Sequence, residues 1–152
     1  MVINGYDLSK DLVLEVGKFA ILWNCFERDL FKNHCNPSKI INSYQNIQID
    51  RDKLQILVDV LNKRRVKFEF DFDEYIEQGL HPNNSTISSS RNIQLMENFL
   101  KQNSDDNICG GLLTILRLRN NLMHGLKDIS ELEEQIELFR AVNAVLQSAK
   151  GI

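Results

Sequence analysis

Residues 112–125 read LLTILRLRNNLMHG, and the rest of the chain is organised around this stretch. Its apolar side chains recur at helical spacing, at Leu112, Ile115, Leu116 and Leu122. A helix is therefore predicted from Leu112 to Met123, with these side chains on its inner face. Gly125 follows, and glycine often stands just past the last regular turn of a helix.

Two side chains at the end of this helix have the chemistry of phosphodiester cleavage. Arg119 is permanently charged, and His124 is of the residue type that titrates near neutral pH. Residues five apart on an α-helix point about 140° away from each other. The pair can share a pocket if the helix breaks before His124, or if a two-fold dimer brings two copies together. Asn120 is four residues before His124 on the same face and is predicted to orient its imidazole.

Arg119, Asn120 and His124 resemble the R-x-x-x-x-H signature of the HEPN superfamily, in which a polar residue, often Asn, follows the Arg. The resemblance extends to the all-helical context and to the order helix, short link, helix across the motif. It implies an all-α fold: a single HEPN-like antiparallel helical bundle over residues 1–152, with two long core helices and shorter flanking helices. Many members are metal-independent ribonucleases of toxin–antitoxin, phage-defence and CRISPR systems, and they act as dimers with both motifs at the interface.

The resemblance implies that the chain is an endoribonuclease in which the 2′-OH of RNA attacks the adjacent phosphate. His124 would act as general acid or base, and Arg119 would stabilise charge on the phosphoryl oxygens. In several HEPN groups an acidic residue on an earlier helix contacts the motif Arg, and Glu27 is the candidate here. Some HEPN toxins carry a Tyr two residues after the His. Leu126 stands at that position, so regulation by modification of such a Tyr is not expected.

Three alternatives stay open at this point. The chain can be a catalytically silent HEPN module that binds RNA, nucleotide or a partner protein. It can be a dimeric antitoxin-like or immunity component that uses its acidic runs as the contact surface. In the simplest structural interpretation, Arg119 is a solvated helix residue, His124 interacts with terminal carbonyls and Glu27 forms a surface salt bridge. Under the nuclease interpretation, a cognate antitoxin or other regulatory protein is a candidate partner besides RNA and a second copy.

The composition is that of an ordinary globular protein. The chain has 152 residues, 43% hydrophobic and 26% charged, which suits one domain. No run of 18 apolar residues and no basic-then-apolar leader is present, so a cytoplasmic location without membrane contact is expected. Three cysteines fit reduced thiols better than a disulfide framework. Cys25, His34 and Cys35 lack the spacing of a zinc site, and no metal or cofactor is expected.

The charges are segregated along the chain although the net charge is only −3. Residues 51–67 hold six basic and two acidic side chains, whereas 69–77 hold five acidic and no basic ones. A basic surface attracts phosphate whatever the total charge, so this segregation is compatible with an RNA partner. Solvated helix faces are the simpler explanation of each run.

The N-terminal half is predicted to be helical. A long helix is expected from Leu8 to Asn33, with a core stripe of Leu8, Leu12, Val16, Phe19, Trp23, Phe26 and Leu30 and a cap at Asp7 or Ser9. A short helix is expected over Lys39 to Asn46, and a surer one over Arg51 to Arg65 with Asp50 as its cap. Residues 66–73 alternate apolar and polar side chains, which predicts an extended segment or an edge hairpin before helix resumes over 73–78.

The second half is predicted as a loop and three helices. Residues 81–90 are polar and rich in turn formers, and a helix follows over Arg91 to Gln102. Gly110 and Gly111 are interpreted as a flexible entry to the motif helix. Ser130 to Glu133 reads as a capping box for the last helix, whose predicted stripe is Leu132, Ile136, Phe139, Val142 or Asn143, and Leu146.

Overall fold

The computed structural model describes residues 1–80, 90–102, 107–125 and 134–152, without the side chains of 78–80 and 121–125. Within these residues the chain is mostly helical, which confirms the predicted all-α class. The elements follow in the order β1 (Val2–Ile3), β2 (Tyr6–Asp7), α1 (Lys10–Phe31), α2 (Pro37–Ser43), η1 (Tyr44–Asn46), β3 (Ile47–Gln48), α3 (Arg51–Lys67), α4 (Phe72–Glu74), η2 (Tyr75–Leu80), α5 (Ser90–Lys101), α6 (Ile108–Gly125), α7 (Ile136–Ser148) and β4 (Lys150–Gly151).

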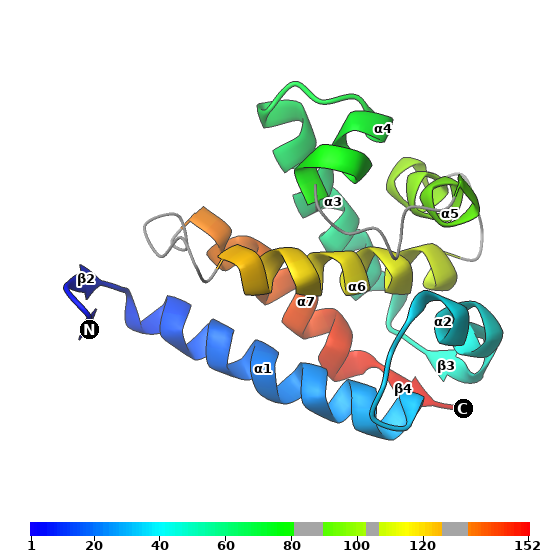
Figure 1. Ribbon diagram of the computed structural model, residues 1–152, viewed down its shortest axis with the longest axis horizontal. Helices are drawn as coiled ribbons and strands as arrows, with labels where there is room; N and C mark the ends of the chain where they lie inside the picture. The colour runs from blue at the N-terminus through cyan, green and yellow to red at the C-terminus, as the bar shows by residue number, and fades with distance from the viewer. Residues whose placement is uncertain (81–89, 103–106, 126–133) are drawn as a thin grey trace.

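Helix α7 lies at the centre of the apolar core. It packs along both α1 and α3, and it passes between them in Figure 1. Of the predicted core stripe, Phe139, Val142, Asn143 and Leu146 are buried, whereas Ile136 is only partly buried and Leu132 lies outside the described residues. Phe139 of α7 meets Phe19 of α1 edge to face, with ring centroids 5.6 Å apart and planes at 72°. Aromatic pairs favour this geometry, which helps to fix how the two helices pack.

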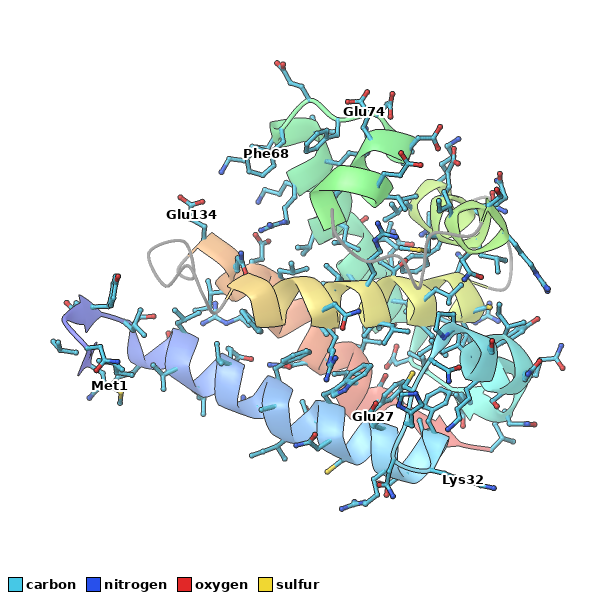
Figure 2. All side chains as sticks on the ribbon, in the orientation of Figure 1. Met1, Glu27, Lys32, Phe68, Glu74 and Glu134 are labelled. Atoms are coloured by element: carbon cyan, nitrogen blue, oxygen red, sulfur yellow. The ribbon has the colours of Figure 1, made fainter. Side chains whose placement is uncertain are left out.

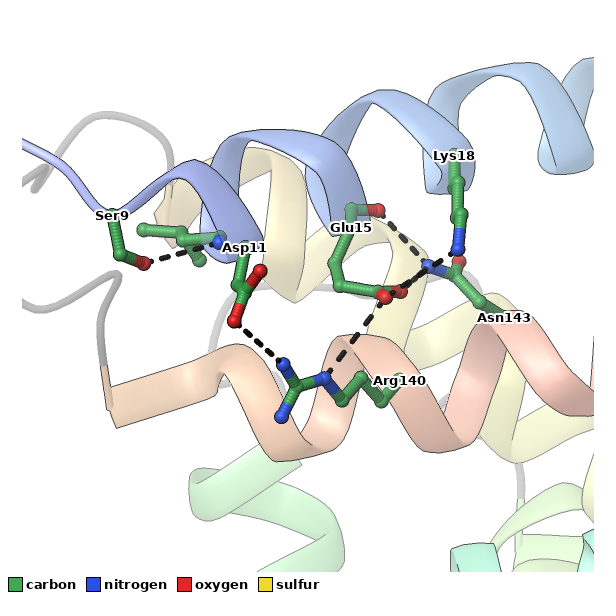
Figure 3. A network of polar contacts seen from close by, with 7 residues as sticks. Ser9, Asp11, Glu15, Lys18, Arg140 and Asn143 are labelled. Atoms are coloured by element: carbon green, nitrogen blue, oxygen red, sulfur yellow. Dashed lines mark hydrogen bonds and ion pairs between the residues drawn. The ribbon is translucent and has the colours of Figure 1, made fainter. Parts of the chain in front are cut away.

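A row of polar contacts runs along one edge of the α1–α7 packing (Figure 3). The Arg140 guanidinium lies 3.5 Å from an Asp11 carboxylate oxygen and 4.0 Å from a Glu15 carboxylate oxygen. Lys18 lies 3.7 Å from the same Glu15 oxygen, Oε1. Ion pairs at exposed positions contribute little to stability, and the Arg140–Asp11 pair is of this kind.

Helix α6 is the centre of a second group of packed helices. It packs against α5 and α2, and Figure 1 shows it crossing the middle of the molecule. Its side chains from Leu112 to Leu118 are buried almost without interruption, including the predicted Ile115 and Leu116. A helix buried on most sides is a core element, and α6 therefore holds the residues at its C-terminal end on a rigid support.

The predicted helices of the N-terminal half are confirmed. Helix α1 begins after Ser9, whose hydroxyl accepts a hydrogen bond from the backbone N–H of Leu12 at 3.1 Å. Helix α3 begins after Asp50, whose carboxylate accepts from the N–H groups of Asp52 and Lys53. Such caps satisfy N–H groups that have no partner within the helix. The short helix expected near residue 40 is present as α2 and η1.

Residues 66–73 do not form the predicted extended segment. Helix α3 continues through Lys67, and α4 begins at Phe72. The turn between them depends on Glu69, which has a left-handed φ of 58°. Arg65 then donates from Nη1 to the backbone oxygen of Phe70 at 3.0 Å, and its guanidinium carbon lies 4.1 Å from the centre of the Phe72 ring. Phe70 and Phe72, two of the alternating aromatic residues, thus contact Arg65 and hold a tight turn between α3 and α4.

Two short antiparallel strand pairs are present that the sequence pattern did not predict. In the first pair, Val2 is opposite Asp7 and Ile3 is opposite Tyr6. The second pairs β3 with β4, with Ile47 opposite Gly151, and so attaches the C-terminal end of the described chain to the segment before α3. Asn-Gly is a typical two-residue hairpin turn, and Asn4-Gly5, both at positive φ, form that turn here.

Two predictions fall partly or wholly outside the described residues. The polar loop over 81–90 does so except for Ser90, which begins α5, and the capping box over 130–133 does so entirely. Helix α7 is described from Ile136. Among the helices in the described ranges, none combines the length and the apolar character needed to traverse a lipid bilayer.

Candidate functional site

The helix that carries the motif begins earlier than predicted. Gly110 and Gly111 were expected to form a flexible entry loop, but they lie in the first turn of α6. A Cβ on Gly110 would stand 2.3 Å from the backbone oxygen of Leu95 in α5. The Thr114 hydroxyl also donates to the Gly110 backbone oxygen at 2.8 Å. The glycine therefore allows α5 and α6 to approach backbone to backbone, and this contact positions the motif helix.

Two arginines on α6 have different environments. Arg117 is only 3% exposed, and its Nη2 donates to the backbone oxygen of Glu77 at 3.4 Å. Burial lowers the pKa of Arg117, and the nearby Glu77 opposes that effect. Arg119, two residues later, is only half-buried. Arg117 therefore serves the packing of α6 against the 75–80 segment, while Arg119 lies where a ligand can reach it.

Arg119 is held by an amide and an aromatic ring. Its Nη1 donates to the Oδ1 of Asn120 at 3.0 Å, and its guanidinium carbon lies 5.7 Å from the centre of the Trp23 ring on α1. A guanidinium over an indole face is attracted by the negative charge density of the ring. Trp23 is 4% exposed and is fixed by its contact with Phe26. The sequence placed Trp23 in the core stripe without indicating this second contact.

Glu27 lies at the end of α1 and closes the turn that follows it. Its Oε2 accepts a hydrogen bond from the backbone N–H of Cys35 at 3.0 Å. The turn passes through Lys32 and Asn33, both with left-handed φ. Figure 2 labels Glu27 and Lys32 at this end of α1. Among the ion pairs of the described residues, none joins Glu27 to Arg119, so the predicted direct contact is not formed within one chain.

Cys35 connects these two groups electrostatically. Burial raises the pKa of its thiol to about 12, with a further increase from the Glu27 carboxylate. Lys39 and Arg119 act in the opposite direction and lower that pKa. Glu27 and Arg119 are thus both close enough to the buried Cys35 thiol to influence its pKa. The thiol itself is protonated at neutral pH and is not an activated nucleophile.

His124 lies in the helix, not beyond it. The backbone of α6 stays helical through Gly125, so the helix does not break before His124. Positions 119 and 124 therefore diverge by about 140° around the axis of one chain, as regular helix geometry requires. The side chain of His124 is outside the described residues, and so is its predicted contact with Asn120. Of the four predicted site residues, the structure brings Arg119 and Asn120 into direct contact.

The described residues contain no evident metal-binding cluster. Within these ranges, no group of three or more His, Cys, Asp or Glu side chains is arranged to hold a metal ion. Cys25, Cys35 and Cys109 are free thiols, so no disulfide joins them. Among the described side chains, those in contact at the candidate site offer a guanidinium, an amide and an indole.

Comparison with known proteins does not add to this description. No protein-family model matches the sequence, and neither the curated proteins nor the solved structures searched contain a significant match.

Proposed function

We propose that this chain is a metal-independent endoribonuclease of the HEPN type with a toxin or phage-defence role. It cleaves RNA by 2′-OH attack, at a site shared between two copies of the chain. The partners implied are RNA, a second copy and a cognate antitoxin or other regulatory protein.

The observation that carries the proposal is the environment of Arg119. Among the described residues it has no carboxylate in an ion pair, and its one hydrogen bond goes to Asn120. The contact with Trp23 holds the guanidinium without neutralising it. The remaining guanidinium nitrogens have no hydrogen-bond partner among the described residues, and the planar fork of Arg suits phosphoryl oxygens.

The proposed reaction needs a proton acceptor, a proton donor and a stabilising cation. One His124 accepts the proton of the 2′-OH, and the 2′ oxygen forms a bond to phosphorus. The bond from phosphorus to the 5′ oxygen breaks, and water supplies the proton to that leaving oxygen. Arg119 of the other chain stabilises the charge that develops on the phosphoryl oxygens. Asn120 positions the Arg119 guanidinium, and it is also proposed to orient the imidazole.

A cleavage assay tests this function. The full chain is incubated with RNA in excess EDTA, and the products should carry 2′,3′-cyclic phosphate and 5′-OH ends. Arg119→Ala and His124→Ala should each abolish cleavage. Arg91→Ala on α5 and His34→Ala remove exposed side chains of the same types and should leave it intact. RNA binding without cleavage would instead favour a catalytically silent module.

A mixing experiment tests the shared site. If each site takes Arg119 from one chain and His124 from the other, an Arg119→Ala/His124→Ala heterodimer retains one intact site of two. Equal mixing after subunit exchange should then restore about a quarter of the wild-type activity, because half of the dimers are mixed. A site built from one chain would give no restoration, since every chain in the mixture lacks one of the two groups.

A further inference from the structure

A groove outside the motif lies between the C-terminal half of α3 and the beginning of α7. Its volume is about 280 Å³, and its walls include Lys63, Arg64, Lys67, Phe68, Glu134 and Gln135. Figure 2 labels Phe68 on one side of this region and Glu134 on the other. Figure 1 shows the C-terminal end of α6 and the beginning of α7 at the same end of the bundle. The groove therefore lies at the end of the molecule to which the motif helix points.

The α3 wall combines cations with an exposed aromatic ring. Lys63, Arg64 and Lys67 lie in the last turns of α3, where positive charge is favoured by the helix dipole. Phe68 follows them and is 54% exposed, and the Lys67 ammonium lies 5.6 Å from the centre of its ring. The helix dipole favours the cations, and the exposed Phe68 ring lies beside them. Cations beside an exposed aromatic ring are the combination that binds phosphate and stacks on a base.

The α7 wall offers hydrogen-bond acceptors. The Oε1 of Gln135 is buried and has no hydrogen-bond partner among the residues that the structure describes, so a ligand that donates to it would be favoured. Glu134 adds an exposed carboxylate at the mouth. Glu137 lies 3.8 Å from Lys63, but both side chains are largely exposed, so this pair opens at little cost. Acceptors on this wall complement the exocyclic amino groups of cytosine, adenine and guanine, whereas uracil has no such group.

We propose that this groove binds a nucleotide of single-stranded RNA at the end of the bundle where α6 ends. Lys63, Arg64 and Lys67 contact the phosphates, Phe68 stacks on the base and Gln135 accepts from its amino group. The inference rests on the proposed function, because it takes RNA to be the substrate that reaches the end of α6. It adds a preference of the bound strand for bases with an amino group.

Binding is measured separately from cleavage. The full chain carrying His124→Ala is titrated into fluorescein-labelled oligocytidylate or oligouridylate of about twelve nucleotides, within the usual site size of single-strand binders. Fluorescence anisotropy reports the dissociation constant. Phe68→Ala, Lys67→Ala and Gln135→Ala are compared in this background. The matched control is Lys53→Ala, which removes an exposed lysine from the other end of α3.

Each variant has its own expected effect. Phe68→Ala should weaken oligocytidylate binding at least about fivefold without changing its salt dependence, because stacking is lost. Lys67→Ala should lower the slope of log K against log salt by about 0.7, the value for one phosphate contact on a single strand. Gln135→Ala should reduce the preference for oligocytidylate over oligouridylate. Lys53→Ala should behave like its parent.

Three results would overturn the proposal. They are no binding of either strand, equal binding by Phe68→Ala and its parent, and binding of cytidine monophosphate as tight as that of the strand. Cleavage by the wild-type chain is read in the separate assay. A chain that cleaves RNA but is insensitive to the groove substitutions refutes the groove alone. A chain that binds RNA through the groove but never cleaves refutes the nuclease alone.

Discussion

The side-chain amide of Asn143 on α7 bonds two oxygen atoms of Glu15 on α1. Its Nδ2 donates to the backbone oxygen of Glu15 at 2.9 Å and to the carboxylate Oε2 at 2.8 Å. Asn143 is 4% exposed, so this link lies within the packed interface of the two helices. A polar residue at a core position is acceptable only when its donors are satisfied, and here the donors face a specific residue of the opposite helix.

Asn143→Ala should destabilise the chain by about 1–3 kcal/mol, because the half-buried Glu15 oxygens lose a donor that water does not fully replace. The control is Gln147→Ala, which removes an exposed amide from the same helix and should change the free energy of unfolding by less than about 0.5 kcal/mol. Urea denaturation of the two variants and the wild type provides the comparison. Equal stability of Asn143→Ala and Gln147→Ala would show that the link to Glu15 contributes nothing net.

Two glycines give opposite predictions for the same substitution. Gly17→Ala should stabilise the chain by about 0.5–1 kcal/mol, because Ala is the better helix former and the added Cβ would meet no neighbouring group of the described residues within 4 Å beyond its own stretch of helix. Gly110→Ala should destabilise it by more than that gain, because the Cβ would stand 2.3 Å from the Leu95 backbone oxygen. Thermal unfolding of both variants tests the prediction. A stabilised Gly110→Ala would mean that α5 and α6 are not in backbone contact.

Sequence patterns predicted the long helices because, in these segments, the helical spacing of apolar residues and the capping residue indicate the same helix. Trp23, Phe26 and Phe19 are buried as the spacing requires, and Ser9 caps the helix that they belong to. The pattern over 66–73 misled because alternation implies a strand only if one face is buried. Phe68 is instead exposed, and a single left-handed residue, Glu69, turns the chain. Glycine was misjudged at Gly110 because its role depends on a neighbouring helix.

The candidate site was predictable as chemistry but not as geometry. Arg119 and Asn120 were identified from residue types and spacing, and they are hydrogen bonded to each other. The contact between Arg119 and Trp23 joins segments far apart in the sequence, so no local pattern could indicate it. The contact of Glu27 with Arg119 was predicted from the family resemblance alone. The Glu27 carboxylate instead accepts a hydrogen bond from the backbone N–H of Cys35, because the left-handed turn after α1 brings that N–H to it.

Arg119 should be removable without unfolding the chain. Arg119→Ala loses the contact with the Trp23 ring and should cost about 0.5–1 kcal/mol, the usual value for such a cation–aromatic contact near the surface. Phe139→Ala in the core should cost about 3–5 kcal/mol. Trp23 is the chain's single tryptophan, so its emission should change in Arg119→Ala and stay unchanged in Arg91→Ala. An unchanged emission spectrum would contradict the Arg119–Trp23 contact, and global unfolding would make any loss of cleavage uninformative.

The buried Cys35 thiol should make the chain less stable at alkaline pH. Burial raises the pKa of its thiol from 9.0 to about 12, so the folded chain holds this proton more tightly than the unfolded chain. The resulting stabilisation is complete below pH 9 and is lost as the pH rises from about 9 toward 12, because the unfolded thiol ionises first.

Cys35→Ala removes this contribution. The difference in unfolding free energy between wild type and Cys35→Ala should therefore shrink between pH 8 and about pH 10.5 in urea denaturation. A constant difference for Cys35→Ala across this pH range would indicate that its thiol ionises at the same pH in the folded and the unfolded chain.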